Sequence, residues 1–342
     1  MLPQPLLAPV VSTIFRKMAD IYNCRVGFWQ RQFLEELFRT VFALRGRVNF
    51  TNLARFSPLH EQTFRRHFKK AFRWVWFNLT VFRLRHHPEE PIIGVFDCSF
   101  LPKSGTKTWG IDRFFSSLAG RPKQGLEVSV LGIVATGSRR AFGVDATQTP
   151  SDLSTDQEDG YTRVDFYLKQ ISDLYDRLAD LGVSYWVGDG FYAKQKVFDT
   201  VTDLGGDLIT RLRSDANLRY LYTGPPKEGL GAPKQYNGKI DWDDQKTLAR
   251  RFDEVGRLPD RPDVRVLTTV ANSPPLWTRP PSRAPRWSRM GGLRGACFNR
   301  HRPACRGSNP VLPPALPDRT CDPGCKTAHW AHPLSGSQSR KA

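Results

Sequence analysis

Cysteine is scarce in this sequence, and long hydrophobic runs are absent. Its six cysteines are irregularly spaced over 342 residues, which excludes the disulfide framework of a small secreted domain. The best apolar run, Val128–Val134, suits a strand and is too short for a membrane span. Leu6–Val11 is also apolar, but no basic segment precedes it and no small-residue cleavage site follows, so we expect no secretory signal. These absences favour a cytoplasmic protein.

Acidic residues are few at both ends of the chain, although not in its middle. Lys and Arg number 51 against 33 Asp and Glu, a formal net charge of +18. Residues 1–90 carry +9, residues 91–270 carry −1 and residues 271–342 carry +10. Basic flanks attract phosphate backbones, and an Asp-rich middle suits a magnesium-dependent site on nucleic acid. A basic surface with no partner is the alternative that charge leaves open.

The first segment, residues 1–90, has the apolar spacing of helices. Apolar residues recur at three- and four-residue steps from Phe28 to Leu44, and a short helix is expected at 51–56. After the turn signal Ser57-Pro58, the spacing predicts a longer helix over 59–82. We therefore expect an all-helical, basic N-terminal domain.

The longer of these predicted helices has two faces, one aromatic and one basic. A short helix, a tight turn and a basic helix outline a helix-turn-helix, which would bind double-stranded DNA. An aromatic stripe facing the core, with an ordinary charged back, is the alternative. The basic residues that would contact DNA are Arg65, Arg66, Lys69, Lys70 and Arg73.

Residues 91–270 combine strands with helices and predict an α/β fold. Helices are expected at 161–181 and 193–204. Two of the strands end in an aspartate after an approach that contains a glycine. The expected strands are 91–97, 125–136, 140–147, 183–189, 207–213 and 264–270.

Asp97 and Asp189 are the main candidates for chemistry. Each follows a hydrophobic strand that would hold its backbone rigid, and on neighbouring strands the two carboxylates would converge. Converging carboxylates repel unless a cation lies between them, and oxygen ligands suit Mg²⁺ or Mn²⁺. Two such ions stabilise the attacking and leaving oxygens of a phosphoryl transfer. The alternative is that each aspartate caps a loop or a helix.

The residues after Asp97 form a second candidate region. Short hydroxyl side chains with Lys103 and Lys107 suit a phosphate-contacting loop, but the Walker spacing of a nucleotide-binding loop is missing. Cys98 is expected to be a small packed residue, because no base that would activate a nucleophile is identifiable.

Five runs carry a family resemblance: GVFDCSFLPKSGTKTWGIDRFF, GLEVSVLGIV, TQTP, YWVGDGFYAK and DLITRLRSDANL. They resemble insertion-sequence transposases of the DDE superfamily, most of all the insertion-sequence-four group, over about residues 30–272. The resemblance implies an RNase H-like core, a mixed sheet with flanking helices, that uses magnesium to cut donor DNA at transposon ends and transfers the 3′ hydroxyl to target DNA. It makes Asp97 and Asp189 the first two catalytic, metal-binding carboxylates. It also implies a β-rich insertion at about 206–270 and DNA contacts by Lys194, Arg211 and Arg213.

The sequence departs from this family where a third carboxylate should lie. The family pattern is Tyr-x2-Arg-x3-Glu-x6-Lys in a late helix; Glu254 matches it in part and lies too early, so we interpret it as a chance match. Residues 271–342 contain no Glu, hold 12 of the 26 prolines and begin with an abrupt change of composition. We expect a disordered basic, Pro- and Arg-rich tail from a reading frame lost near residue 270. This copy would then lack its third metal ligand and be inactive.

Two other functions stay open beside the transposase. One is a noncatalytic, transposase-derived DNA-binding protein that keeps the basic helices. The other is a zinc-stabilised interaction protein organised by the tail, although the short paired spacing of common zinc modules is missing on one side. For the transposase we expect association with the nucleoid, and a homodimer on DNA is a further option. The ligands for zinc would be Cys297, His301, Cys305, Cys321, Cys325 and His329.

Overall fold

The chain forms two compact units, one ending at Arg85 and the other beginning at His86. No helix in the described part of either is both long and apolar enough to cross a membrane. The computed structural model describes residues 7–105, 107–151, 153, 160–212, 216–225, 229, 234–258, 261–272, 286–290 and 296–299.

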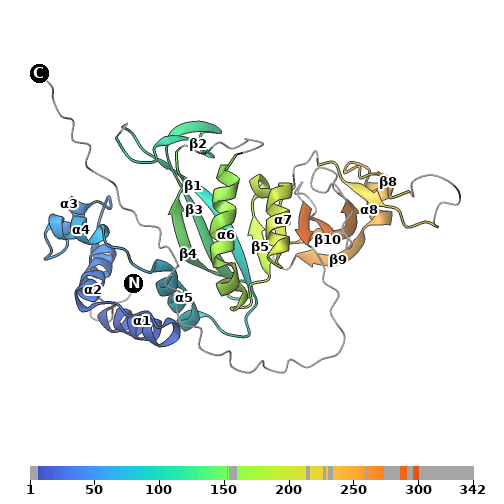
Figure 1. Ribbon diagram of the computed structural model, residues 1–342. Helices are drawn as coiled ribbons and strands as arrows, with labels where there is room; N and C mark the ends of the chain where they lie inside the picture. The colour runs from blue at the N-terminus through green and yellow to red at the C-terminus, as the bar shows by residue number, and fades with distance from the viewer. Residues whose placement is uncertain are drawn as a thin grey trace, which may run out of the picture. The chain divides into compact units, whose positions relative to one another are not determined.

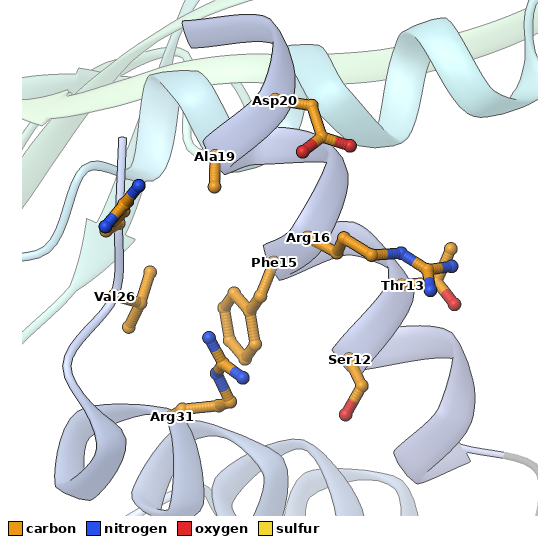
Figure 2. A pocket seen from close by; sticks show the side chains of 9 residues that line it. Ser12, Thr13, Phe15, Arg16, Ala19, Asp20, Val26 and Arg31 are labelled. Carbon is orange, nitrogen blue, oxygen red and sulfur yellow. The ribbon is translucent and has the colours of Figure 1, made fainter. Parts of the chain in front are cut away.

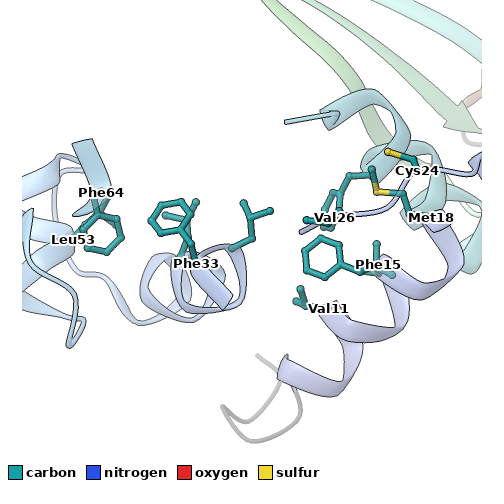
Figure 3. Close-up of a cluster of buried hydrophobic side chains, with 12 residues drawn as sticks. Val11, Phe15, Met18, Cys24, Val26, Phe33, Leu53 and Phe64 are labelled. Atoms are coloured by element: carbon teal, nitrogen blue, oxygen red, sulfur yellow. The ribbon is translucent and has the colours of Figure 1, made fainter. Parts of the chain in front are cut away.

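The secondary structure of the first unit consists of helices joined by short connections among its described residues (Figure 1). Its helices are α1 (Leu7–Tyr22), α2 (Phe28–Ala43), α3 (Phe50–Arg55), α4 (Glu61–Phe68) and α5 (Trp74–Arg85). Side chains from all five helices fill one core, in which Phe15, Phe33 and Phe64 are buried (Figure 3). The rings of Phe33 and Phe64 pack edge to face with centroids 5.8 Å apart. Burying each such side chain stabilises the unit by about 1.5–3 kcal/mol.

The single helix predicted over 59–82 is instead two helices, because the chain leaves the helical path at residues 69–73. In a continuous helix, the basic side chains here would stack like charges at four-residue steps, which is unfavourable. The break also lets Phe72 reach the core, with its ring centroid 6.4 Å from that of Phe15 and 4.6 Å from that of Trp74. Aromatic packing therefore overrides the local helical spacing.

The helices α3 and α4 follow one another around the Ser57-Pro58 turn, as predicted. The side chain of Asn49 caps α3 by accepting the N–H of Asn52 at 2.8 Å. His60 caps α4 in the same way through the N–H of Gln62. Such caps satisfy backbone donors that a short helix leaves unpaired. The helix-turn-helix outline is present, and DNA binding by it stays a prediction.

The second unit contains a mixed sheet with helices against it (Figure 1). The strands β1 and β3 pair antiparallel, whereas β1, β5 and β6 run parallel to one another. The predicted α/β class with a mixed sheet is thus confirmed, with one strand more than expected, β2. The elements are β1 (Ile92–Pro102), β2 (Asp112–Ser116), β3 (Arg121–Ala135), β4 (Arg140–Gln148), α6 (Arg163–Ala179), β5 (Tyr185–Gly188), α7 (Gln195–Asp203) and β6 (Asp207–Thr210).

The strand order in this sheet is β2-β3-β1-β5-β6, with β4 also paired to β3. Helix α6 starts at a capping box made by Thr162 and Asp165. Its Tyr175 stacks on Trp186 of β5 with ring centroids 5.8 Å apart. This contact ties the helix to the middle of the sheet, beside the candidate site.

A second sheet follows, with the order β12-β11-β10-β7-β8 and β9 paired to β10. The β-rich insertion expected at 206–270 begins later than predicted, because residues 207–210 form β6 of the first sheet. The elements are β7 (Arg219–Leu221), β8 (Tyr236–Lys239), α8 (Gln245–Arg251), β9 (Asp253–Leu258), β10 (Arg261–Asn272), β11 (Arg286–Met290) and β12 (Ala296–Asn299).

Two of these strands lie within residues 271–342, where we expected only disorder. β11 pairs antiparallel with β10, from the residue pair Val270 and Arg286 to the pair Val266 and Met290, and β12 pairs with β11. The composition of this segment predicted disorder because it has few branched apolar residues. The hydrogen bonds of a β-ladder join backbone groups, so a strand can pair without such residues. The rest of the predicted tail, with most of the proposed zinc ligands, lies outside the described residues.

Candidate active site

Asp97 lies inside β1, not at the end of a strand as predicted. The strand continues to Pro102 because β3 pairs with it along its whole length. By contrast, β5 pairs only with Gly94 and Val95 of β1. The strand β1 therefore runs on past the end of β5, and Asp97 stands where the two strands part.

Asp189 directly follows the last residue of β5. Val95 and Val187 are partners in the parallel ladder, and Asp97 and Asp189 each come two residues later on their own strands. The two aspartates thus lie level at the same end of neighbouring strands, as the sequence predicts for adjacent parallel strands.

The pKa of Asp97 is raised above its usual range. Desolvation of the carboxyl group is the largest cause; the hydrogen bond from the Cys98 N–H opposes it, and the negative charge of Asp189 raises the pKa further. The two carboxylates therefore interact, and their mutual repulsion opposes ionisation of Asp97. A cation bound between them would remove this repulsion.

In each aspartate, one carboxylate oxygen accepts a local hydrogen bond. Asp97 Oδ1 accepts the N–H of Cys98 at 2.8 Å, and Asp189 Oδ1 accepts the N–H of Phe191 at 2.9 Å. The backbone carbonyl of Asp189 also accepts the hydroxyl of Thr210 at 2.6 Å. Asp189 thus does cap a short 3₁₀ turn, the alternative role that its sequence position suggested. Within the described residues, neither Oδ2 accepts a hydrogen bond, so both remain available to a ligand.

Two glycines allow the strands to pack tightly below the carboxylates. A Cβ at Gly94 would lie 2.8 Å from the ring of Trp186, and a Cβ at Gly188 would lie 2.9 Å from the ring of Phe96. Trp186 is completely buried and Phe96 nearly so. Each glycine therefore makes room for an aromatic ring of the neighbouring strand, which lets β1 and β5 pack closely below the aspartates.

A buried polar cluster lies on the other side of β1 from Asp97. Cys98 Sγ is 3.0 Å from the hydroxyl of Tyr192, and the hydroxyl of Tyr167 donates to Glu127 at 2.5 Å. Burial raises the pKa of Cys98 to about 12, so the thiol stays protonated near neutral pH. Cys98 is thus a packed residue, as predicted, and its thiol is unsuited to nucleophilic attack.

An aromatic residue that the sequence analysis passed over lies next to Asp189. Phe191 is 42% exposed although it is a large apolar residue, and Lys194 Nζ lies 4.4 Å from its ring centroid. The ring and the ammonium group form a cation–π pair beside the carboxylates. The sequence carries no signal that separates exposed Phe191 from its buried neighbour Tyr192.

The other basic candidates are placed in different parts of the molecule. Lys103 and Lys107 are exposed in the connection from β1 to β2, and Arg211 is exposed just after β6. Arg213 lies outside the described residues. The five basic candidates of α4 and the following turn belong to the helical unit and are all exposed.

Asp97 and Asp189 have the side-chain type, a carboxylate, that binds divalent cations such as Mg²⁺. Mg²⁺ is commonly held by one or two carboxylates together with water and substrate phosphates, which is the donor set that Asp97 and Asp189 supply. Among the described residues, no group of three or more His, Cys, Asp or Glu side chains could hold a metal ion. Glu254 lies in β9 of the second sheet.

Residues 28–266 match the family model described as DDE superfamily endonuclease. The match covers well over half of the chain, including both aspartates, and the chain therefore belongs to this family. No curated protein matches the sequence.

Two solved structures share low similarity with the chain. One is endonuclease V of Ciona intestinalis in complex with a 24mer DNA containing an inosine followed by a ribo-adenosine, at 13% identity and a TM-score of 0.22, covering 36% of this chain and 46% of that chain. The other is endonuclease V of Bacillus subtilis, at 10% identity and a TM-score of 0.24, covering 68% of this chain and 77% of that one. The chain thus matches less than half the length of the Ciona protein.

Proposed function

We propose that this protein derives from a DNA-cutting transposase of the DDE superfamily, in which Asp97 and Asp189 hold a divalent cation at the scissile phosphate. The observation that carries the proposal is the level placement of two interacting carboxylates on neighbouring parallel strands, within a chain of the DDE superfamily endonuclease family. The strand order of the first sheet is compatible with the RNase H-like core that the sequence resemblance implies.

Each group near the carboxylates has a role in this proposal. Asp97 and Asp189 would hold Mg²⁺ or Mn²⁺, which would supply charge stabilisation at the phosphoryl oxygens. Lys194 neutralises a backbone phosphate, and Phe191 offers a surface on which a base can stack. Exposed Lys103, Lys107 and Arg211 would contact phosphates on either side.

We infer further that the ancestor belonged to the insertion-sequence-four group and that this copy is impaired. A complete site of that group would cut at transposon ends and transfer the 3′ hydroxyl to target DNA. Two carboxylates hold one ion loosely, and no third acidic ligand joins them among the described residues. The copy therefore binds metal weakly and cannot complete transposition.

The test is direct measurement of metal binding and DNA nicking. Titration of Mn²⁺ followed by electron paramagnetic resonance should detect one weakly bound ion, which Asp97→Asn and Asp189→Asn each abolish. Asp199→Asn, an exposed aspartate of α7, is the matched control and should bind Mn²⁺ as the parent does. Any nicking of supercoiled plasmid in Mn²⁺ should disappear in the same two variants. Unchanged Mn²⁺ binding in both would refute the metal site.

A noncatalytic DNA-binding protein is the second candidate, and the exposed basic residues around α4 favour it. Under this alternative, Asp97→Asn and Asp189→Asn bind a DNA duplex as the parent does, and none of the three proteins nicks DNA. Nicking that depends on the two aspartates would exclude it.

A further inference from the structure

The hairpin formed by β2 and the start of β3 extends beyond the other strands of the first sheet (Figure 1). β1 ends at Pro102, opposite Gly125 of β3, and β4 ends opposite Val128. β2 pairs with residues 121–125 of β3, in five residue pairs. Past Gly125, the described strands therefore form a ribbon of only two strands, residues 112–116 and 121–125, which spans about 17 Å.

The ribbon leaves the sheet at the end that carries the candidate carboxylates. Asp97 pairs with Val130 in the ladder of β1 and β3, and six residues along β3 from Val130 lie Gln124 and its partner Arg113. At about 3.4 Å per residue, Arg113 lies about 20 Å along the sheet from the level of Asp97. B-DNA rises about 3.4 Å per base pair, so this distance corresponds to about six base pairs.

One face of the ribbon continues the face of the sheet that carries Asp97. Residues opposite each other in an antiparallel ladder share a face, and the faces alternate along each strand. By this register, Arg113 and Phe115 project from the same face as Asp97. All three residues are exposed, Phe115 to 60%. The surface that begins at the carboxylate therefore continues onto the ribbon.

The opposite face of the ribbon is held by α6. Phe114 is completely buried, and Arg163 Cζ of α6 lies 4.4 Å from its ring centroid. Arg163 Nη2 also donates to Asp112 Oδ2 at 3.0 Å. This ion pair neutralises the one acidic residue of the ribbon. The ribbon is thus fixed in place before a partner binds, which lowers the entropic cost of binding.

The charges left on the ribbon are basic. Arg113, Arg121 and Lys123 are exposed, and none forms an ion pair or a side-chain hydrogen bond with another described residue. Gln124 Nε2 donates to the carbonyl of Gly105 at 3.0 Å, which brings the lysine-bearing loop after β1 against the ribbon. Basic groups without carboxylate partners attract a polyanion, and the major groove of B-DNA, about 12 Å wide, admits a two-stranded ribbon.

The hollow between α1 and the start of α2 has no comparable surface, although Arg16 and Arg31 are in its lining. Figure 2 shows the Arg31 side chain beside the ring of Phe15 and the Arg16 side chain directed to the other side of α1. These two guanidinium groups do not face one ligand, whereas the register of the ribbon places its basic residues along one continuous element.

We propose that the ribbon binds the major groove of a DNA duplex, about six to eight base pairs from the phosphate that lies at Asp97 and Asp189. The position of that phosphate rests on the proposed function, whereas duplex binding by the ribbon does not. Arg113 enters the groove and donates to base edges, and Phe115 makes apolar contact there. The long side chains of the opposite face, Arg121 and Lys123, reach the phosphates that border the groove.

Photocrosslinking of the full chain identifies the partner of the ribbon. p-Benzoylphenylalanine in place of Phe115 should cross-link to a fluorescent 20-base-pair duplex. The same probe in place of Arg140, an exposed residue at the opposite end of the sheet, should not. A cross-link from position 115 to a second copy of the chain and not to DNA would overturn the proposal and make the ribbon a dimer contact. The absence of any cross-link from this position would also overturn it.

Duplex affinity across a salt series separates the proposed contacts. Arg113→Gln should weaken binding about tenfold, the usual effect of losing a base contact. Arg121→Gln with Lys123→Gln should lower the slope of log affinity against log salt by about 1.8, because two phosphate contacts are lost. Phe115→Ala should weaken binding without changing the slope. Arg140→Gln is the control and should change affinity less than twofold, and losses in the ribbon variants no larger than this would refute the contacts.

The outcome for the ribbon is independent of the outcome for the metal site. Asp97→Asn and Asp189→Asn should keep the DNA cross-link from position 115 while they lose Mn²⁺. Binding of Mn²⁺ by the parent without that cross-link would overturn the ribbon and leave the metal site standing. A cross-link to DNA in a parent that binds no Mn²⁺ would support the ribbon and overturn the proposed function alone.

Discussion

At the scale of residues, the two carboxylates proposed to bind the metal ion also reduce the stability of the metal-free fold. Asp97 and Asp189 are placed level by strand pairing, and neither is neutralised by a basic side chain through an ion pair among the described residues. Desolvation and the charge of Asp189 raise the pKa of Asp97, so ionising it opposes folding. Functional sites often retain such conflicts, because a ligand resolves them.

Replacing Asp97 by Asn should stabilise the metal-free protein at pH 7. Because the pKa of Asp97 is raised in the folded state, the unfolded chain loses this proton at lower pH, and stability falls as the pH rises through the window between the two pKa values. Asn has no charge, and its oxygen can still accept the Cys98 N–H. In EDTA, the melting temperature of Asp97→Asn should exceed that of the parent at pH 7.

The gain should disappear at acid pH, where the Asp97 carboxyl is neutral in both states, and should shrink when Mg²⁺ is added. Asp199→Asn, which removes an exposed carboxylate of α7, serves as the control. A melting-temperature difference that stays constant from acid to neutral pH would contradict the assignment of this shift to Asp97.

Replacing Gly94 by Ala should destabilise the second unit. The added Cβ would lie 2.8 Å from the ring of Trp186, which is fully buried and cannot move away cheaply. Overpacking of this kind costs about 1–3 kcal/mol. Gly143→Ala is the matched control, because no atom lies within 4 Å of its added Cβ. Urea unfolding should separate the two variants, and equal midpoints would mean that the strands can shift at no cost.

At the scale of elements, the helical unit presents basic residues on exposed surface, and buried aromatic residues such as Phe15, Phe33 and Phe64 contribute to its core. The helices α3 and α4 keep the helix-turn-helix outline, and the break at residues 69–73 redirects the basic residues that follow α4. Arg65 pairs with Glu61 four residues earlier, a surface ion pair that contributes little to stability. These residues are therefore available for a role other than holding the fold.

Neutralising the five basic residues around α4 should weaken DNA binding and flatten its dependence on salt. Each phosphate contact releases counterions, with a slope of about −0.9 per contact in log affinity against log salt. The variant is Arg65, Arg66, Lys69, Lys70 and Arg73 all changed to Gln. Binding of a fluorescent duplex across a salt series measures the slope. Lys239→Gln with Lys246→Gln is the control, and a slope unchanged in the five-residue variant would place these side chains away from DNA.

At the scale of the whole molecule, the chain joins a helical unit, a mixed sheet with two level carboxylates and a second sheet that extends past residue 272. The family match reaches residue 266 and includes the first two carboxylates. A third carboxylate does not join them in the described residues. The proposal developed above gives this molecule a DNA-binding helical unit and a site for one metal ion that lacks a third carboxylate.

Restoring the reading frame after codon 270, so that the chain continues into a helix with the Tyr-x2-Arg-x3-Glu-x6-Lys pattern, should restore cleavage. The added glutamate would complete the ligands for a second ion, which both supports the leaving oxygen and tightens metal binding. Mn²⁺ titration should then count two ions in place of one, and DNA cleavage should rise with it. If the unmodified chain already cuts and joins DNA as fast as the restored one, the incomplete-site interpretation is wrong.

The sequence by itself predicted helices in residues 1–90 and a mixed α/β fold after them, and it singled out the two aspartates that strand pairing places level. Apolar spacing located α2, α6 and α7 because a helix buries one face every 3.6 residues, and strand-length apolar runs located β1, β3 and β5. A glycine shortly before each aspartate, Gly94 and Gly188, was a further local signal, since the close approach of Trp186 and Phe96 requires the missing side chain. These signals are local, so they can be read along the chain.

Only the tertiary structure decided the features that depend on contacts between distant residues. β1 continues beyond Asp97 because β3 pairs with it, and β11 forms because β10 offers backbone partners. The exposure of Phe191 beside Asp189 is likewise not encoded by spacing. Strand pairing and side-chain burial join segments far apart in sequence, and local periodicity carries no record of which partner each segment meets.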